Sequence, residues 1–221
     1  MTVIDQSQFS ARLRQVTQDD HQSAESSKFI TTLMGGERSA RDYTLLIAQY
    51  RYIYAALEEE VRKLANDPEL APIFNLALER SANIEKDLAV LLPANGFDQA
   101  PAALESTKNY VAAIHAAAAE PARLVAHHYL RYLGDLSGGL AIGKLVARHY
   151  DIQPEALNMW NFEDIEKPKL YKDGYRLQLD AFGQDETRAE ALLDEAKRGF
   201  QWNKSMFGEL LQASEEHLAA A

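Results

Sequence analysis

Apolar residues recur at intervals of three and four along most of this 221-residue chain. That spacing places them on one face of an α-helix, whereas the alternating pattern of a β-strand is scarce. Turn-forming residues, chiefly glycine, proline and asparagine, divide the chain into segments of helical length. The predicted helices span residues 5–28, 39–65, 72–92, 102–119, 121–150, 169–182 and 185–213. We therefore predict an all-α fold, with Ser39 as the N-cap of the second helix and Asp42 in its first turn.

Length and composition favour a single domain. The chain is 47% hydrophobic and 25% charged, an ordinary balance for one globular domain over residues 1–221, with a core over about residues 5–213 and a frayed C-terminal tail. The N-terminus lacks the apolar stretch of a signal peptide, and no apolar run approaches the roughly 20 residues that span a bilayer. We expect a cytoplasmic monomer without a stable membrane anchor.

The charge balance narrows the choice of ligand. Lys and Arg number 23 against 33 Asp and Glu, a formal net charge of −10, which disfavours binding to nucleic acid or to an anionic membrane. An anionic ligand therefore requires a local basic cluster. The chain has no cysteine, which excludes disulfides, thiolate metal sites, iron–sulfur clusters and cysteine nucleophiles. Histidine is left as the expected type of axial metal ligand.

The predicted helix over residues 121–150 is interrupted by four glycines, each of which costs about 1 kcal/mol relative to alanine. They are Gly134, Gly138, Gly139 and Gly143. Gly134 and Gly138 lie one turn apart on one face, where the backbone can approach a flat ligand closely, and the pair Gly138-Gly139 permits a kink. The opposite face is expected to pack into the core through Leu133, Leu136 and Leu140. Close packing between helices is the alternative explanation, since it also uses small residues.

Polar side chains border the apolar face of the first predicted helix. Arg14, His21 and Glu25 follow one another at spacings of seven and four, which places a cation, a potential metal ligand and a carboxylate in one stripe. Glu25 is one turn from His21, where a carboxylate orients an imidazole ligand. The same stripe is also consistent with an ordinary solvent-facing helix edge.

Further polar residues accompany the glycines. Arg131 and Asp135 are four apart at the rim of the glycine face, where Asp135 would hold ordered water, although the same spacing suits a simple ion pair within the helix. Tyr54, Tyr110 and Asn203, on three other predicted helices, are suited to extend such a water network or to lie singly at the edge of the core.

A basic cluster is present in this otherwise acidic chain. Lys172 and Arg176 lie one helical turn apart in KDGYR, and Lys167 and Lys169 precede them. Such cations bind carboxylates or phosphates. A solvated cationic helix face is the equally available alternative.

At HHYLRYLGDLSGG, residues 127–139, the sequence strongly resembles the haem oxygenase family, specifically its short soluble bacterial members. The resemblance extends from about Arg14 to Leu210 through further motifs in the family's order: HQSAE, YIYAALEEE, LERSANIEKDL, KDGYR and FQWNKSMF. It implies a single-domain multi-helical fold in which haem is sandwiched between an N-terminal proximal helix and a kinked, glycine-containing distal helix.

Carried over position by position, the resemblance implies a role for each matching residue. His21 would be the proximal ligand of the haem iron, stabilised by Glu25. Gly134 and Gly138 would let the distal helix lie over the haem, and Asp135 would anchor the distal water network. That network would also include Arg131, Tyr54, Tyr110 and Asn203. The basic residues near the haem propionates would be Arg14, Lys172 and Arg176, and the residues at the pocket would be Tyr129, Phe200 and Phe207.

The resemblance further implies that haem b is both substrate and cofactor. With dioxygen, and with electrons from an external ferredoxin or flavoprotein reductase, the protein would convert haem to biliverdin, carbon monoxide and ferrous iron for iron acquisition, with α-meso cleavage as the family default. The chain departs from the family at two positions: Arg14 stands where Lys is frequent, and Leu140 stands where Gln is expected. The first preserves the charge, and the second alters a packing contact or a hydrogen bond.

Four other functions compete with this one. A non-enzymatic haem binder or carrier would use the same fold and stop at binding. A carboxylate-bridged di-iron bundle, suggested by Glu58-Glu59-Glu60, requires Glu-x-x-His on two helices, and no histidine here has Glu three residues before it. A thiaminase-like enzyme of similar architecture would need a cysteine nucleophile. A purely helical interaction module is the general alternative.

Overall fold

The computed structural model describes residues 8–220, with side chains described through His217. The chain is helical, and no strand occurs within this range, so the all-α prediction is confirmed. The α-helices are α1 (Phe9–Val16), α2 (Gln18–Glu25), α3 (Lys28–Met34), α4 (Ala40–Leu64), α5 (Ser81–Ala94), α6 (Glu105–Ala117), α7 (Pro121–His128), α8 (Leu140–Tyr150), α9 (Pro168–Phe182) and α10 (Glu186–Ala220). Short 3₁₀ segments are η1 (Leu76–Leu78), η4 (Pro154–Ala156) and η5 (Asn158–Trp160).

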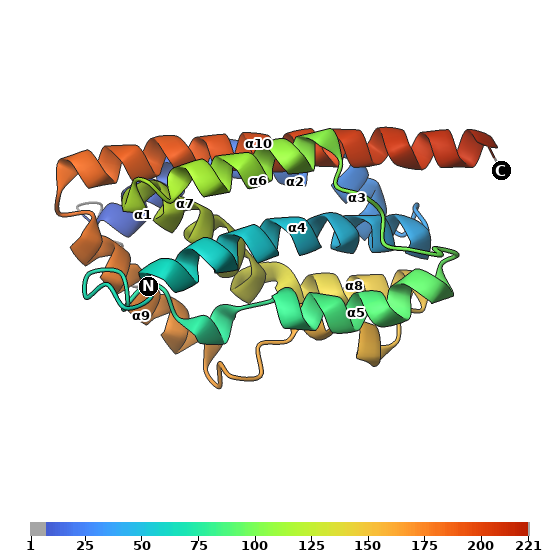
Figure 1. Cartoon of the computed structure of the whole chain (residues 1–221), viewed down its shortest axis with the longest axis horizontal. Coiled ribbons are helices and arrows are strands. Elements are labelled where there is room, and N and C mark those ends of the chain that lie inside the picture. The colour runs from blue at the N-terminus through green and yellow to red at the C-terminus, as the bar shows by residue number, and fades with distance from the viewer. Residues whose placement is uncertain (1–7, 221) are drawn as a thin grey trace.

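The helix α4 lies in the middle of the fold (Figure 1). It packs against α5 and α6, and most of its apolar side chains are buried. The longest helix, α10, runs along α6 and also contacts α2, α3 and α7. α9 lies at one end of the molecule, where it packs against α1. α10 therefore packs against both the N-terminal helices and α7.

None of the described helices is both long enough and apolar enough to cross a membrane.

The beginning of α4 agrees with the sequence. The Ser39 hydroxyl accepts a hydrogen bond from the Asp42 N–H at 3.2 Å, and the Asp42 carboxylate accepts one from the Ser39 N–H at 3.0 Å. This reciprocal capping box satisfies two N–H groups that a helix otherwise leaves unpaired. Ser39 is thus the N-cap, as predicted.

The helix predicted over residues 72–92 is wrong at its beginning. Residues 72–80 form turns around η1, and α5 begins only at Ser81. The carboxylate of Glu58, buried on α4, accepts hydrogen bonds from the backbone N–H groups of Arg80 at 2.5 Å and Ser81 at 2.9 Å. A tertiary contact therefore caps α5, and no local sequence signal reveals it.

The N-terminal helix predicted over residues 5–28 is divided. Residues 5–7 lie outside the described part of the chain. α1 and α2 meet at Thr17, whose hydroxyl donates to the Leu13 carbonyl at 2.8 Å, a local bond that bends helices. At the other end of the chain, the tail expected to fray beyond residue 213 is helical as far as Ala220.

The helix predicted over residues 121–150 is continuous, but its middle is not α-helical. Two π-helical segments, η2 (Tyr129–Leu133) and η3 (Asp135–Gly139), separate α7 from α8. Bonding from i to i+5 adds a residue to each turn, and such turns occur frequently at functional sites. The kink expected at Gly138-Gly139 therefore takes the form of π-helical turns.

A buried histidine fastens this segment to α9. His128 stacks on Tyr175 with the ring centroids 5.6 Å apart and the planes 4° from parallel. The Tyr175 hydroxyl lies 2.7 Å from Nδ1 of His128, which accepts its hydrogen bond in the neutral imidazole. Burial lowers the pKa of His128 to about 3. The contact therefore depends on a neutral ring.

Replacing His128 with Phe should remove part of the acid sensitivity of the fold. Because the pKa of His128 lies near 3 in the folded state and near 6.5 otherwise, its stabilisation is complete above pH 6.5 and is lost as the pH falls toward 3. The free energy of unfolding should fall by about 2 kcal/mol between pH 7.5 and pH 5 through this group alone. Urea unfolding of the parent and of His128→Phe at both pH values measures the difference.

The variant should start from a lower stability at pH 7.5, because the Tyr175 hydroxyl loses its acceptor. His217→Gln, an exposed change on α10, is the control and should alter the free energy of unfolding little. An equal pH dependence in the parent and in His128→Phe would contradict the prediction.

Candidate functional site

The four glycines of the predicted distal helix fall into two pairs. A Cβ atom added to Gly134 or Gly138 meets no atom within 4 Å, so this pair presents bare backbone to open space. A Cβ on Gly139 would lie 3.1 Å from Cε3 of Trp160, and one on Gly143 would lie 3.3 Å from the Trp160 Cβ. The first pair therefore leaves room for close approach of a flat ligand, and the second packs against protein.

The leucines expected opposite the glycines do not share one environment. Leu133 is buried and Leu136 is half-buried, but Leu140 is 61% exposed. The expectation that all three pack into the core is wrong for Leu140, because the π-helical turns shift the register on which an α-helical wheel relies. An exposed position accepts either leucine or the glutamine expected there, which accounts for this departure from the family pattern.

A buried hydrogen-bonded cluster connects α4, the π-helical segments and α10. The Tyr54 hydroxyl donates to Oδ2 of Asp135 and accepts from Nε and Nη2 of Arg131 at 3.1 and 3.0 Å. Nη1 of Arg131 donates to Oδ1 of Asn203 at 2.8 Å. Nδ2 of Asn203 in turn donates to the Gly199 carbonyl at 3.0 Å. Four predicted residues from three helices are thus joined in one chain of hydrogen bonds.

Arg131 and Asp135 are linked through Tyr54, and within residues 8–220 they form no direct ion pair of the kind that their spacing allowed. The buried Arg131 guanidinium also lies 4.4 Å from the ring centroid of Tyr50, a contact that is favourable when the charge is desolvated. Burial raises the pKa of Asp135, and both the charge of Arg131 and the hydrogen bond from Tyr54 oppose that rise. Opposed effects of this kind are typical of groups that exchange protons at functional sites.

Tyr110 of α6 lies beside this cluster but outside its hydrogen-bonded chain. Its hydroxyl is buried and has no hydrogen-bond partner in the part of the protein that the structure describes. Burial raises the pKa of Tyr110 to about 12, and the nearby charge of Arg131 partly offsets the rise. Tyr110 therefore lies next to the cluster without joining its hydrogen bonds.

His21 presents its imidazole at the surface of α2. The side chain is 52% exposed, and Nδ1 lies 3.3 Å from Oε2 of Glu25, one turn further along the helix. No hydrogen bond to Nε2 occurs within residues 8–220. The carboxylate is thus placed to orient the ring through Nδ1 and leaves Nε2 available, the arrangement that a histidine metal ligand uses.

α10 brings the two halves of the candidate site together. Phe200 meets His21 edge-on with ring centroids 5.6 Å apart, and Asn203, three residues further along α10, bonds Arg131. Residues three apart are neighbours on one helix face. The predicted proximal histidine and the distal cluster are therefore held by one stretch of a single helix. Phe207, also predicted to line the pocket, is 7% exposed and packs in the core.

The predicted cations gather at the edge between the proximal and distal segments. Burial raises the pKa of Tyr129, and Arg176 of α9 and Arg14 of α1 lie close enough to oppose this rise. Lys172 reaches the distal segment, where its Nζ donates to Oγ of Ser137 at 3.2 Å. Cations from two separate helices thus border the site. Lys167 and Lys169, which precede these residues in the chain, are exposed.

The acidic run that suggested a di-iron bundle serves the fold instead. Glu58 caps α5, and Glu60 lies 2.6 Å from Nδ1 of His115 and 3.0 Å from Nζ of Lys63. The described residues contain no group of three or more histidine and carboxylate side chains arranged to hold a metal ion.

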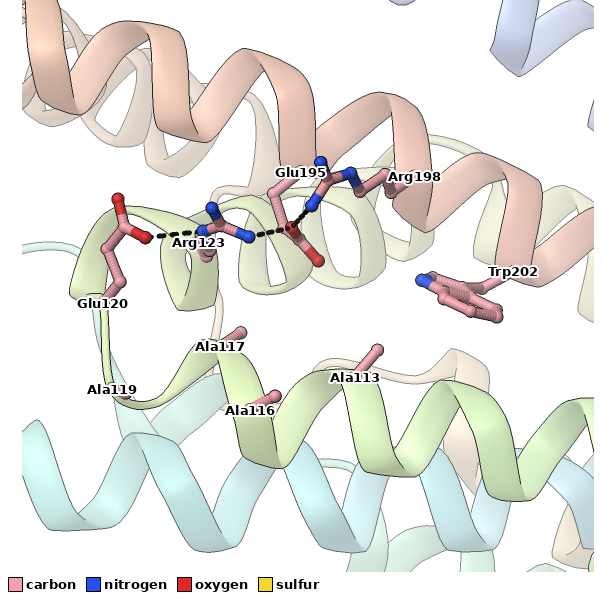
Figure 2. A pocket seen from close by; sticks show the side chains of 9 residues that line it. All are labelled: Ala113, Ala116, Ala117, Ala119, Glu120, Arg123, Glu195, Arg198 and Trp202. Atoms are coloured by element: carbon pink, nitrogen blue, oxygen red, sulfur yellow. Dashed lines mark hydrogen bonds and ion pairs between the residues drawn. The ribbon is translucent and has the colours of Figure 1, made fainter.

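A surface cleft of about 260 Å³ lies elsewhere, between α6, α7 and α10 (Figure 2). At its wall the buried carboxylate of Glu195 lies 3.4 Å from Arg123 and 3.5 Å from Arg198, so the charges there are largely paired. None of the residues predicted for the functional site lines this cleft. The cleft is therefore separate from the site built around Gly134 and His21.

Sequence reasoning missed Tyr50, Thr17 and Trp160. Tyr50 precedes Tyr54 by one helical turn, so the spacing on α4 was a usable signal. Thr17 lies one turn before His21, and its hydroxyl opposes the rise in the pKa of Tyr129 that burial causes. Trp160 belongs to an irregular segment after α8, and only the folded chain places it against the glycines.

Comparison with known proteins identifies the family of the chain. Residues 7–209 match the family model described as "Heme oxygenase". Heme oxygenase 1 of Gallus gallus is 33% identical over 199 residues, which cover 88% of this chain and 67% of that protein. Heme oxygenase 1 of Synechocystis sp. is 31% identical over 200 residues, which cover 90% of this chain and 83% of that protein.

Solved structures agree as well. The crystal structure of heme oxygenase-1 from Synechocystis sp. in complex with heme superposes with a TM-score of 0.88 at 30% identity, covering 96% of both chains. The structure of heme oxygenase from Leptospira interrogans gives a TM-score of 0.84 at 29% identity, covering 91% of this chain and 99% of that one.

Tyr54→Phe should raise the pKa of Asp135, because the hydrogen bond from Tyr54 is one of the effects that lower it. Burial already raises the pKa of Asp135 in the folded state, so this group favours folding most at low pH and its contribution is lost as the pH rises through the folded pKa. The variant should therefore lose more stability at pH 7 than at pH 3.5. A ¹³C NMR titration of the Asp135 carboxyl in the ligand-free protein, assigned with Asp135→Asn, measures the shift.

The matched control is Tyr52→Phe on the same helix, whose hydroxyl donates to the Pro101 carbonyl at 3.0 Å. It should leave the pKa of Asp135 as it is in the parent. An unchanged or lower pKa in Tyr54→Phe would show that the tyrosine does not support the ionised carboxylate.

Proposed function

This chain belongs to the haem oxygenase family, and on that premise we propose that it cleaves haem oxidatively to biliverdin, carbon monoxide and ferrous iron. The observation that carries the proposal is the buried Tyr54–Asp135 contact beside the open backbone face of Gly134 and Gly138. Haem binding alone requires no buried proton donor and acceptor next to a flat-ligand face. Catalysis on the bound ring does.

The residues of the site fit haem. A planar macrocycle needs backbone that approaches it closely, and a Cβ at Gly134 or Gly138 would occupy that space. The ring also needs an axial ligand, and His21 is an exposed imidazole already oriented by Glu25. Two propionates need cations, and Arg14 and the basic residues of α9 border the site. When bound, haem supplies a redox-active iron that reacts with dioxygen.

On the proximal side, His21 would hold the iron through Nε2, and Glu25 would accept a hydrogen bond from the Nδ1–H group. This pairing fixes the tautomer and the plane of the ring, and it increases the basicity of the ligand. Phe200, which meets the His21 ring edge-on, would restrict rotation of the His21 side chain. A thiolate ligand donates electron density that favours O–O cleavage, and a histidine ligand lacks this effect.

On the distal side, Asp135 would hold and move a proton. Tyr54 and, through it, Arg131 engage Oδ2 of Asp135, and no side chain within residues 8–217 donates to Oδ1. Oδ1 would accept a hydrogen bond from water beside the glycine face. Asn203 holds Arg131 in place from α10. Positioned proton transfer of this type typically contributes a factor of about 10² to 10⁴ in rate.

The cations would fix how the ring is turned in the site. Arg14, Lys172 and Arg176 lie along one edge, so the propionates of the haem would face that edge. The rotation of the ring in its own plane would decide which meso carbon lies nearest the distal residues, so regiochemistry would follow from orientation. We propose α cleavage, with electrons from a ferredoxin or flavoprotein reductase, in a cytoplasmic monomer that releases iron for use by the cell.

The function is tested by adding haem to the protein, then reductant and air, and following the absorption spectrum. We expect the Soret band to give way to a bile pigment, which chromatography then identifies by isomer. Asp135→Ala should still bind haem but form biliverdin about 100-fold more slowly, because the distal proton carrier is lost. Asp194→Ala, an exposed change on α10, is the matched control.

Stable haem binding without any pigment formation would identify the protein as a haem carrier. Biliverdin formation at the parent rate in Asp135→Ala, with haem bound, would remove Asp135 from the mechanism.

His21→Ala should weaken haem binding by roughly tenfold to 100-fold or more and abolish the spectrum of a histidine-ligated haem, because no other exposed imidazole adjoins Phe200 in the described structure. Imidazole added to the variant should restore that spectrum. His149→Ala, a change at an exposed residue of α8, should leave both quantities as in the parent. An unaltered spectrum in His21→Ala would refute the ligand assignment.

A further inference from the structure

An aromatic side chain from the irregular segment after α8 lies against the glycine-rich bend. Trp160 is 4% exposed, and its ring fills the space in which Gly139 and Gly143 lack side chains. A Cβ on Gly139 would stand 3.1 Å from Cε3, which is closer than ordinary van der Waals contact. The indole therefore touches the bend on a face different from the open face of Gly134 and Gly138.

Trp160 is also anchored to the core. Its Nε1 donates a hydrogen bond to the Tyr43 hydroxyl of α4 at 2.9 Å, and Tyr43 is fully buried. The backbone just before it is held by α5, where the buried Asp87 carboxylate accepts from the N–H groups of Asn158 and Met159 at 2.8 Å each. The indole is thus fixed by two core helices and not by the bend that it contacts.

The contact with the indole depends on the π-helical register. Gly139 is the last residue of η3 and Gly143 lies one turn into α8. If η2 and η3 relaxed to α-helix, each turn would lose a residue, and everything beyond them would rotate about the helix axis. Gly139 and Gly143 would then leave the indole, and Asp135 would lose its alignment with Tyr54.

We propose that Trp160 is a positioning residue that locks the π-helical register of the distal segment, and thereby sets both the contact of Asp135 with Tyr54 and the height of the Gly134–Gly138 face over haem. The part concerning haem rests on the proposed function. The part concerning Asp135 does not, because it concerns the ligand-free protein. An ordinary core tryptophan would affect stability alone, whereas a register lock also acts on a carboxyl group in another part of the segment.

The experiment compares Gly139→Ala, Trp160→Leu and the double variant. In Gly139→Ala the added methyl group collides with the indole and displaces the bend, which should weaken the hydrogen bond from Tyr54 to Asp135. The pKa of Asp135 should therefore rise, as measured by ¹³C NMR titration of the ligand-free protein. Haem affinity should fall about tenfold, the range seen when groups that support a metal ligand site are disturbed. In the double variant the methyl group occupies space vacated by the indole, so both effects should be smaller than the sum of the single changes.

Two further variants keep the test decisive. Gly208→Ala on α10, where unlike at Gly139 an added Cβ meets no atom within 4 Å, controls for the gain in helix propensity and should leave the pKa of Asp135 unchanged. Tyr43→Phe removes only the acceptor of the indole N–H, and it should raise the pKa of Asp135 slightly and broaden the distribution of biliverdin isomers. It remains informative if Trp160→Leu fails to fold.

The proposal is overturned if Gly139→Ala and Tyr43→Phe lower thermal stability but leave the pKa of Asp135, haem affinity and the isomer distribution as in the parent. Strict additivity in the double variant would overturn it as well. A shifted pKa of Asp135 in a protein that does not degrade haem would support the register lock while rejecting the proposed function, so the two failures are distinguishable.

Discussion

The buried guanidinium of Arg131 is the interaction on which the site depends. A charge in the core is tolerated only when its donors are paired, and removal of a single partner costs several kcal/mol. Here Tyr54 of α4 and Asn203 of α10 accept its hydrogen bonds, and the ring of Tyr50 lies against its face. These contacts hold three parts of the fold in one relative arrangement. Asp135, which shares Tyr54 with Arg131, is fixed by the same arrangement.

The distal segment combines that rigidity with an open face. Two glycines leave backbone bare on the face where haem is proposed to bind, and two others admit the indole of Trp160 behind the bend. Glycine is unfavourable in a helix, and π-helical turns are rare. Both costs fall on the same few residues, which is where folded proteins commonly accept strain for function. The tertiary contacts of Arg131 and Trp160 offset them.

Much of this site was predictable because its residues carry their chemistry in their type and spacing. His21 and Glu25 are one turn apart, the glycine motif is long and specific, and the basic residues of α9 stand out in an acidic chain. The alternative of a direct ion pair between Arg131 and Asp135, and the expected burial of Leu140, fail for a common reason. Both assumed an α-helical register, and the π-helical turns change which residues face each other.

The sequence by itself determined the helical class of the fold, the family, and the chemical groups available for an axial ligand, a proton carrier and a propionate edge, because periodicity and residue identity are local properties. Tertiary structure alone decided where α5 begins, how Tyr54 joins Asp135 to Arg131, and which glycines face protein. Those outcomes depend on groups far apart in the chain, such as Glu58 with Ser81 and Trp160 with Gly139. No local pattern encodes a contact whose partner lies on another helix.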